Sequence, residues 1–380
     1  MGRIVYCDYS ATTYVKKEVL DEMLPYFSME FGNASAVYSI GRNARTAVEN
    51  SRKIVSNALG CKKEEIYFTS SGSEADNMVL LGIARANKNK GKHIITSKIE
   101  HLAVLNTCKQ LEKEGFELSY IGVDKNGFID LEELKNSIRE DTILISVMMA
   151  NNEIGTIEPI KEIGKIAKEK NVIFHSDCVQ AIGHMKIDVT DLGLDALALS
   201  AHKFYGPKGI GTAYIKKGIS FNPVILGGHQ ECSKRAGTEN VAGIVGIAKA
   251  IELANINIYS HNENLLYLRN SLKENIIKNI PGTVINADVN NRLPGHMSIS
   301  IEDIDARNLL LMLDMNGICV SAGSACNSNS ENISHVLNAI GMSKEQALST
   351  IRITLGDANT TEDIEYISTI LEDIVKKMRK

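Results

Sequence analysis

The stretch that decides the fold is Ala198-Leu199-Ser200-Ala201-His202-Lys203-Phe204-Tyr205-Gly206-Pro207-Lys208-Gly209-Ile210-Gly211. An apolar run ends on Ser200, a polar triplet follows, and a loop rich in Gly and Pro then interrupts regular structure. The pattern predicts a buried strand with Lys203 just beyond its carboxyl end, the edge at which α/β proteins bind ligands. Lys203 would be available there to form a Schiff base, although a lysine at a strand end is, taken alone, more often a solvated surface residue.

A second apolar run, residues 172–180, places an acid at a comparable position. Its strand-like part ends on Asp177, one predicted strand before Lys203. A carboxylate at the end of a buried strand is the partner that a pyridinium nitrogen needs, whereas a lone Asp there is more often a helix cap. Asp177 and Lys203 lie 26 residues apart across one βα unit. This spacing resembles that of pyridoxal phosphate (PLP) enzymes with the aspartate aminotransferase type of fold.

Around these two residues the chain alternates between apolar runs and amphipathic stretches rich in Lys and Glu, from about Glu64 to Lys217. This alternation predicts a three-layer α/β/α large domain with a mainly parallel sheet. After Pro281 the pattern changes, and it predicts a smaller α+β C-terminal domain. We expect the large domain over 15–255 and the small one over 256–380, together with 1–14. The predicted strands are Ile66–Thr69, His93–Ser97, Leu118–Val123, Thr142–Met149, Val172–Asp177, Ala196–Ser200, Thr212–Ile215 and Met297–Ile301, and the main predicted helices are Ser73–Asn87, Leu102–Glu114, Leu131–Ser137, Ile160–Lys168, Thr238–Ala254 and Asp305–Leu313.

A phosphate site is predicted where the run Ile66–Thr69 meets the next helix, through the turn Ser70-Ser71-Gly72-Ser73. Free backbone N–H groups and the dipole at a helix N-terminus favour an anion. Gly72 and Ser73 are therefore candidates for binding phosphate. The alternative is an ordinary helix cap, since Ser71 and Ser73 are both good N-cap residues.

Composition excludes several classes of protein. Of 380 residues, 44% are hydrophobic and 23% charged, as in a folded globular protein, and the net charge of −4 gives no basic field for nucleic acid or anionic lipid. The N-terminus lacks a signal-peptide pattern and no run approaches about 18 apolar residues, so we expect a cytoplasmic protein with no membrane contact. The 7 cysteines are scattered without a C-x-x-C pair, which argues against disulfides and a metal site.

Short motifs spread along the chain extend the resemblance. Together they are similar to those of cysteine desulfurases of the NifS/IscS type, in the class V aminotransferase family, over essentially the whole chain. This resemblance implies a PLP-dependent enzyme that converts L-cysteine to L-alanine. The matching segments are Asp8–Thr13, Gly32-Asn33, Phe68–Asn77, Glu100-His101, Asn151–Gly155, Asp177 with Gln180, Ser200–Gly211, Arg235–Asn240, Gly323–Cys326 and Ile351-Arg352.

The resemblance assigns four residues to the cofactor ring. Lys203 would hold PLP covalently, and Asp177 would keep the ring nitrogen protonated. Gln180 would donate to the phenolate oxygen of the ring, and His101 would stack on the ring. His101 would also take part in catalysis.

The resemblance further assigns the cofactor phosphate and the substrate. Thr238 would reach the phosphate of a neighbouring subunit, which makes a homodimer the expected form. Arg352 would pair with the substrate carboxylate through two parallel hydrogen bonds, a geometry that lysine reproduces poorly. Asn152 would lie near both substrate and cofactor. The residues expected at the phosphate within one chain are Gly72, Ser73, Ser200 and His202.

Cys326 would determine the reaction. It follows Gly323-Ser324-Ala325 in a run of small, turn-forming residues that predicts a loop, and the resemblance makes its thiol the acceptor of the substrate sulfur as a persulfide. The sulfur would then pass to an acceptor or cluster-scaffold protein, for iron–sulfur cluster, thiolated tRNA or cofactor synthesis. We expect the other six cysteines to be inert core residues, with Cys178 facing away from the ring.

Three departures from the family pattern affect the site. Tyr38 stands where a histidine is usual, His229 interrupts a glycine-rich element, and Asn327 follows the expected nucleophile in place of Thr or Ser. Two other functions stay open. A PLP aminotransferase or β-eliminating lyase would make Cys326 incidental, and a sulfur-relay or scaffold protein would have kept the fold without the activity.

Overall fold

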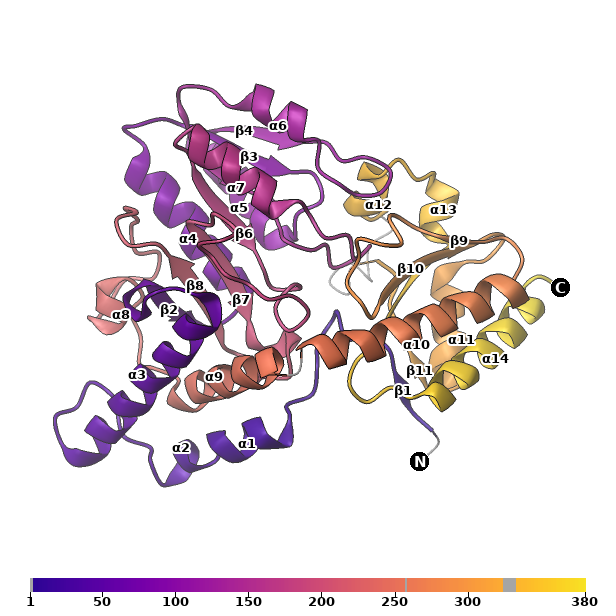
Figure 1. The fold of residues 1–380 in the computed structure, drawn as a ribbon, viewed down its shortest axis with the longest axis horizontal. Coiled ribbons are helices and arrows are strands. Elements are labelled where there is room, and N and C mark those ends of the chain that lie inside the picture. Colours follow the sequence, from indigo (N-terminus) through magenta and orange to yellow (C-terminus); the bar gives the residue numbers. More distant parts are fainter. Residues whose placement is uncertain (1–2, 257, 324–332) are drawn as a thin grey trace.

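A computed structural model describes residues 3–256, 258–323 and 333–380. Its centre is a sheet of seven strands in the order β2-β8-β7-β6-β5-β3-β4 (Figure 1). The five strands β3 to β7 pair in parallel, and β8 runs antiparallel to both of its neighbours. The strands are β2 (Ile66–Thr69), β3 (His93–Ser97), β4 (Glu117–Ile121), β5 (Thr142–Ser146), β6 (Ile173–Asp177), β7 (Ala196–Ser200) and β8 (Gly211–Ile215).

Helices cover both faces of this sheet. Strands such as β5 and β7 are therefore buried at every position. On one face, α4 (Gly72–Asn87) and α5 (Leu102–Lys113) form an apolar cluster with the sheet. On the other face, α3 (Ser39–Leu59), α7 (Ile160–Glu169) and α9 (Val241–Ile256) form a second cluster. The predicted three-layer α/β/α arrangement with a mainly parallel sheet is confirmed.

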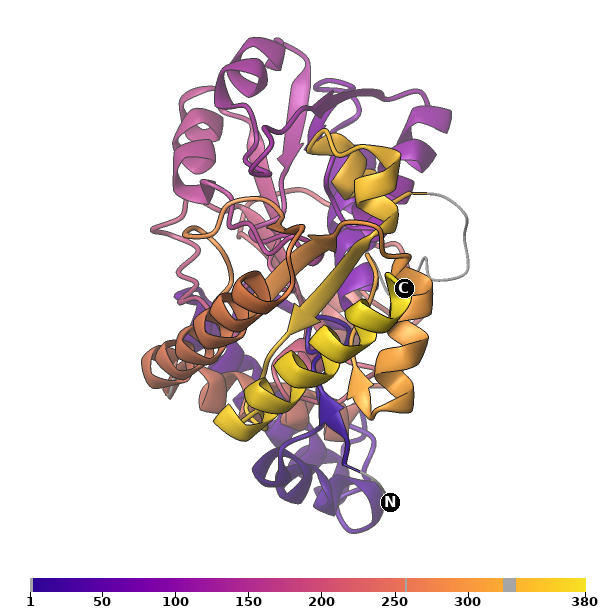
Figure 2. The ribbon, with the colours of Figure 1, turned by 90° about the vertical axis from the view of Figure 1, so that its right-hand side faces the viewer.

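A smaller sheet of antiparallel strands in the order β12-β10-β9 lies beside the large one, with the parallel pair β1–β11 next to it. Helices α10 and α14 lie side by side across this part of the molecule (Figure 2). Its core joins Val5 and Cys7 to side chains between Leu265 and Val375. The domain boundary near Ile256 stays a prediction. The elements here are β1 (Val5–Tyr6), α10 (Ile258–Asn279), β9 (Thr283–Ile285), β10 (His296–Ile301), α11 (Ala306–Met315), β11 (Ile318–Cys319), β12 (Thr350–Thr354) and α14 (Thr361–Met378).

The N-terminal segment connects the two sheets. After β1, the N–H of Ser10 donates to Thr354 Oγ1 at 3.0 Å, and the N–H of Thr13 donates to the carbonyl of His202 at 2.9 Å. This segment therefore runs from β12 to the loop that follows β7. The remaining helices are α1 (Lys17–Met23), α2 (Pro25–Ser28), α6 (Leu131–Ser137), α8 (Gln230–Ser233), α12 (His335–Ala339) and α13 (Lys344–Leu348), with short 3₁₀ turns η1 (Lys63–Glu65) and η2 (Ala201–Lys203).

Helix α9 begins three residues later than predicted. The side chain of Asn240 accepts from the N–H of Gly243 at 3.1 Å, and its carbonyl accepts from Ile244, so Asn240 rather than Thr238 satisfies the first turn. No single helix in the described ranges is long and apolar enough to cross a membrane. The pair α9 and α10, bent by 73°, meets those criteria only when taken together.

Removal of the Leu199 side chain should weaken the strand that leads to Lys203. Leu199 is fully buried in the cluster beneath β7, so Leu199→Ala should lower the free energy of unfolding by about 2–5 kcal/mol. Leu311, which is 65% exposed on α11, provides the control. Leu311→Ala should change the free energy of unfolding by less than about 0.5 kcal/mol. Urea titration measures both, and equal effects would contradict the assigned core.

Candidate active site

A cavity of about 240 Å³ lies at the carboxyl ends of β6 and β7. The parallel pairing of these strands brings their ends to the same edge of the sheet. The loops after β3 and β5 and the start of α4 complete the walls. Ten of the residues predicted for the site line this cavity together: Gly72, Ser73, His101, Asn152, Asp177, Gln180, Ser200, His202, Lys203 and Arg352.

Lys203 ends the turn η2 directly after β7. Its Nζ donates to the carbonyl oxygen of Ser10 and to that of Ala11, the latter at 2.9 Å. The side-chain amide of Gln180 donates to the same Ser10 carbonyl at 2.9 Å. The N-terminal segment thus holds the amine of Lys203 and the amide of Gln180 at one point of the cavity.

Asp177 and His101 are two titratable groups that line the cavity. Asp177 is 5% exposed, and its carboxylate accepts from the N–H of Val179 at 2.9 Å. Burial raises the pKa of Asp177, while the nearby His101 and Lys203 oppose that rise. Burial lowers the pKa of His101. His101 Nδ1 accepts from the N–H of Ala103 at 3.1 Å, which places the proton of the neutral ring on Nε2.

A second carboxyl group beside Asp177 was missed at the sequence level. Asp76 lies on α4, is 1% exposed and lines the cavity. Its Oδ1 lies 3.5 Å from His175 Nε2. Burial and the charge of Asp177 raise the pKa of Asp76 well above its usual range. Burial lowers the pKa of His175 to about 3, so the His175 ring is neutral. Asp76 follows Glu74 by two residues near the start of α4, so the sequence pattern does not distinguish it from an ordinary acid of a first helical turn.

The start of α4 provides an anion site whose shape depends on glycine. Ser71 caps the helix by accepting from the N–H of Glu74 at 3.1 Å, so the remaining N–H groups of the first turn lack an intrahelical acceptor. A Cβ on Gly72 would lie 2.7 Å from Val179 Cγ2 and 3.3 Å from Ser200 Cβ. The helix end therefore approaches β6 and β7 closely enough to form one side of the cavity, a shape and charge suited to a phosphate.

His202 lies on the same side of the cavity. Its Nδ1 lies 3.1 Å from Thr12 Oγ1. Burial, reinforced by the charge of Lys203, lowers the pKa of His202 to about 4, so the ring is neutral at physiological pH. It is therefore able to contribute a hydrogen bond rather than a charge to an anion.

Arg352, on β12, also lines the cavity. It is 2% exposed, its Nη2 donates to Asp8 Oδ1 at 2.7 Å, and its Nη1 donates to the carbonyl of Asn152 at 2.9 Å. Its Nε has no partner among the described residues. Asp8 also accepts from the hydroxyl of Ser321 at 2.8 Å. A buried guanidinium that lines a cavity is suited to bind a carboxylate.

Two predicted site residues lie outside this group. Thr238 lines a separate pocket with Arg235 and Asn240, and not the cavity. Cys326 lies outside the described residues. Of the other cysteines, Cys178 is fully buried in the core as expected, with its Sγ 3.5 Å from the Ser176 carbonyl. The expectation that all six are core residues is wrong for Cys232, which is exposed on the short helix α8, and Cys61 and Cys319 are only partly buried.

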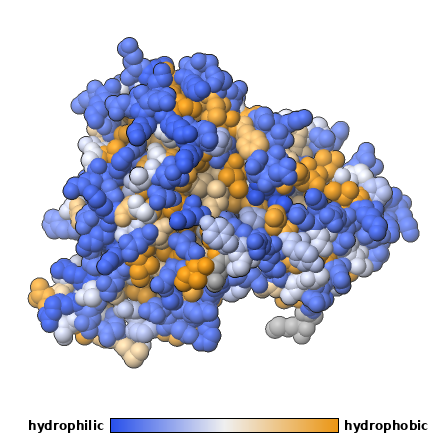
Figure 3. All heavy atoms as spheres, in the orientation of Figure 1, coloured by the Kyte–Doolittle hydropathy of each residue, from blue (hydrophilic) through white to orange (hydrophobic). Residues whose placement is uncertain are grey.

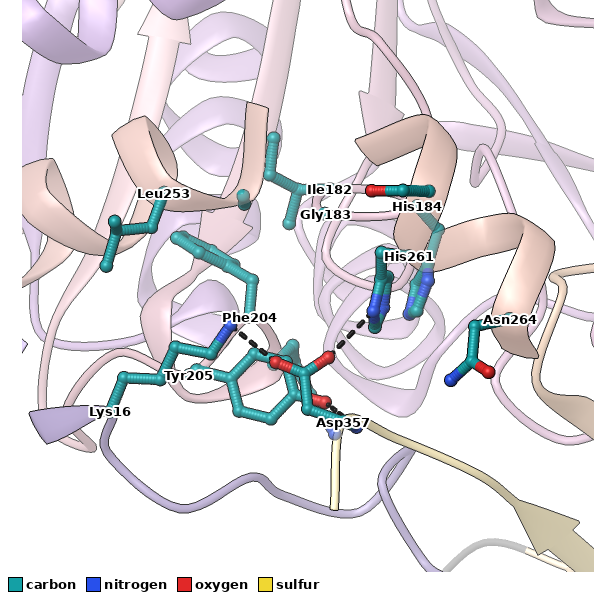
Figure 4. A pocket seen from close by; sticks show the side chains of 13 residues that line it. Lys16, Ile182, Gly183, His184, Phe204, Tyr205, Leu253, His261, Asn264 and Asp357 are labelled. Atoms are coloured by element: carbon teal, nitrogen blue, oxygen red, sulfur yellow. Dashed lines mark hydrogen bonds and ion pairs between the residues drawn. The ribbon is translucent and has the colours of Figure 1, made fainter. Parts of the chain in front are cut away.

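Another cavity, of about 280 Å³, adjoins Lys203 and is shown in Figure 4. Apolar side chains form one wall. At the other wall Asp357 pairs with Lys16 and with His261 Nδ1, the latter at 2.7 Å (Figure 4). The N–H of Asp357 donates to the Tyr205 hydroxyl at 2.8 Å. These contacts attach the segment after β12, and with it Arg352, to the segment that carries Lys203.

Comparison with known proteins agrees with this geometry. A profile of the aminotransferase class-V family matches residues 5–367. A protein of Clostridium botulinum named cysteine desulfurase IscS is 55% identical over all of this chain and 96% of its own length, and one of Methanosarcina thermophila with the same name is 52% identical over 100% and 93%.

A solved structure titled NifS-like protein agrees with a TM-score of 0.94 at 38% identity, over 99% of this chain and 100% of that one. The resemblance, the fold class and the enzyme class expected from the sequence are confirmed. These similarities imply dependence on PLP. The chain belongs to the aminotransferase class-V family, as one of its cysteine desulfurases of the IscS and NifS type.

Proposed function

We propose that this cysteine desulfurase converts L-cysteine to L-alanine in the cavity at β6 and β7 and takes the sulfur onto Cys326 as a persulfide. The observation that carries the proposal is the meeting of Lys203, Asp177, His101 and Arg352 around one cavity. These residues supply an amine, a buried acid, an aromatic base and a carboxylate-binding cation, the set that PLP chemistry on an amino acid requires.

The cavity fits PLP on the grounds of its own chemistry. The start of α4, with Gly72 and Ser73, would bind the phosphate together with Ser200 and His202. At the other end, Asp177 would hold the proton on the ring nitrogen, since a cation there offsets the cost of burying the carboxylate. Gln180 would donate to the phenolate oxygen, His101 would stack on the ring and Lys203 would form the covalent link. When bound, PLP supplies an electron-poor ring that stabilises negative charge at the substrate Cα.

Arg352 would bind the substrate carboxylate. Arg352 lines the same cavity as Lys203, and substrate would share or displace the bond from Nη2 to Asp8. The carbonyl of Asn152 fixes the other nitrogen of the guanidinium. The side chain of Asn152 would therefore lie near both substrate and cofactor.

The reaction then needs removal of a proton from the substrate Cα, transfer of the sulfur, and return of protons to Cβ and Cα. Lys203 would remove the proton from the substrate Cα, because its amine becomes available once substrate has replaced it on the cofactor. The thiolate of Cys326 would attack the substrate sulfur. An S–S bond forms, the Cβ–S bond breaks, and its electron pair stays on the carbon. Protonation at that carbon completes the methyl group, and return of a proton to Cα, which Lys203 would deliver, completes alanine.

A homodimer is the proposed form. Thr238 lies away from the cavity of its own chain, as expected for a residue that contacts the phosphate of a neighbour. Figure 3 shows apolar patches between the hydrophilic side chains of one face. In the segment from α1 to α3, the side chains of Leu24, Phe27, Phe31 and Val37 are between 52% and 85% exposed. A second copy of the chain would cover these exposed side chains.

The destination of the sulfur stays a prediction. A sulfur-acceptor or cluster-scaffold protein is the expected partner, and iron–sulfur clusters, thiolated tRNA and cofactors are the expected end points. The cytoplasmic location and the lack of direct contact with nucleic acid or membrane also stay predictions. These properties depend on surfaces and on other proteins rather than on the cavity.

The role of Cys326 is tested by Cys326→Ser. The variant should keep the change in the PLP absorption spectrum on addition of L-cysteine, since the cavity is intact, but should form no persulfide and release no sulfide. Cys232→Ser, at the exposed cysteine of α8, is the matched control and should behave as the wild type. Sulfide release by Cys326→Ser at the wild-type rate would remove Cys326 from the mechanism.

The role of Arg352 is tested by Arg352→Lys. Lysine keeps the charge but not the planar fork, so kcat/KM for L-cysteine should fall by about 10- to 100-fold, mainly through KM, as expected for loss of a charged hydrogen bond. Arg3→Lys, at a surface pair with Asp363, should leave KM unchanged. Steady-state kinetics measures both variants. An unchanged KM in Arg352→Lys would place the substrate carboxylate elsewhere.

A further inference from the structure

The guanidinium of Arg352 is already paired with a carboxylate of the chain itself. Asp8 Oδ1 accepts from Arg352 Nη2 at 2.7 Å. The side chains of Arg352 and Asp8 are 2% and 14% exposed. In the part of the chain that the structure describes, Asp8 is the one acid that forms an ion pair with Arg352. The positive charge that would attract the carboxylate of an amino acid is therefore neutralised from within.

The backbone of Asp8 is held in place independently of its side-chain charge. Asp8 forms a parallel bridge with Thr354, which lies two residues beyond Arg352 on β12. The hydroxyl of Tyr6 lies 2.9 Å from the carbonyl oxygen of Asp8. Replacement of the carboxylate by an amide should therefore leave the chain where it is.

The other oxygen of the carboxylate is also occupied. Asp8 Oδ2 accepts from the hydroxyl of Ser321 at 2.8 Å. The backbone of Ser321 is bound to β12, because its N–H donates to the carbonyl of Arg352 at 3.1 Å. Arg352 has a second anchor in the carbonyl of Asn152, to which Nη1 donates at 2.9 Å. The guanidinium thus keeps one of its two hydrogen bonds when Asp8 is altered.

Asp8 acts on a bound amino acid through Arg352. The described residues that line the cavity include Ser10, Ala11 and Arg352 but not Asp8. Two carboxylates that contact one guanidinium repel each other, and this repulsion is stronger in a protein interior than in water. A buried cation without a counter-ion is costly. The carboxylate of Asp8 therefore stabilises the empty site and opposes the binding of a second carboxylate.

We propose that Asp8 competes with the substrate carboxylate for Arg352 and so sets how tightly the enzyme binds amino acids. Asp8 is a positioning residue in this scheme, since it acts through Arg352. Substrate binds by sharing Arg352 with Asp8 or by taking its place. The inference rests on the proposed role of Arg352 toward the substrate carboxylate.

An isosteric variant separates the charge of Asp8 from its shape. In Asp8→Asn, the amide oxygen still accepts from Arg352 and the amide nitrogen still finds a partner in the hydroxyl of Ser321, while the negative charge is lost. If Asp8 only held Arg352 in place, the variant would bind amino acids as the wild type does or more weakly. If Asp8 competes with substrate, the variant binds amino acids more tightly.

Binding is measured on the PLP-loaded enzymes by following the PLP absorption spectrum during titration with L-alanine or with L-alaninamide, which lacks the carboxylate. The Kd for L-alanine should be at least about tenfold lower in Asp8→Asn, because a like charge has been removed. The Kd for L-alaninamide should not change. KM for L-cysteine should fall as the Kd for L-alanine does, with no rise in kcat, because the carboxylate is bound alike before and during the reaction. Asp141→Asn, at an exposed pair with Arg139, is the matched control and should behave as the wild type.

Thermal unfolding provides a measurement that does not depend on activity. Asp8→Asn leaves Arg352 buried without a counter-ion, so its Tm without ligand should lie on the order of 5 °C below that of the wild type. The same concentration of L-alanine should raise the Tm of Asp8→Asn by more than that of the wild type, because the variant binds it more tightly.

Ser321→Ala provides a second variant with the opposite expectation, and it keeps the charge of Asp8. Loss of the hydroxyl removes a donor that stabilises the carboxylate, so Asp8 should pair more strongly with Arg352. The Kd for L-alanine should then rise by about threefold relative to that for L-alaninamide.

Three results would overturn the inference. They are an unchanged or higher Kd for L-alanine in Asp8→Asn, an equal fall in the Kd for L-alaninamide in that variant, and an unchanged or lower Kd for L-alanine in Ser321→Ala. A wild-type enzyme that binds L-alaninamide as tightly as L-alanine would instead overturn the proposed role of Arg352.

Discussion

The structure depends on the parallel pairing of β6 with β7. Asp177 lies opposite Ala198 in this ladder, so the carboxyl end of β6 lies beside the turn that carries Lys203. An acid and an amine are brought together there from two separate parts of the chain. Because the acid is 5% exposed, its charge needs a cationic partner, and the protonated ring of a bound cofactor is the partner that the chemistry of the cavity suits.

Much of the large sheet follows from local pattern. Strands β2, β3 and β7 begin and end where the apolar runs do, because burial on both faces leaves little room for polar residues. Element ends were less predictable. Helix α9 starts at Val241 because the side chain of Asn240 accepts from an N–H of its first turn. Thr238 and Asn240 are both good capping residues, and the sequence pattern alone does not show which of them caps the helix.

Lys203 and Asp177 could be predicted because each stands at the end of an apolar run, and the carboxyl ends of strands are where α/β proteins bind ligands. Contacts between distant segments could not be predicted in this way. Asp8 and Arg352 form a buried ion pair across 344 positions, and no periodicity links them. Asp76 was missed because a buried acid in a helix resembles a surface residue until its neighbours are known. Thr238 lies apart from the cavity in one chain, so its predicted role depends on a second copy.

The central claim is that this cavity carries out desulfuration. Its most direct test is the product balance after L-cysteine and a thiol reductant are added to the PLP-loaded protein, with alanine, pyruvate and sulfide measured together. Because sulfur leaves to a thiolate and its electron pair stays on carbon, alanine should equal sulfide, with little pyruvate. Pyruvate and ammonia in place of alanine would show β-elimination and would contradict the account.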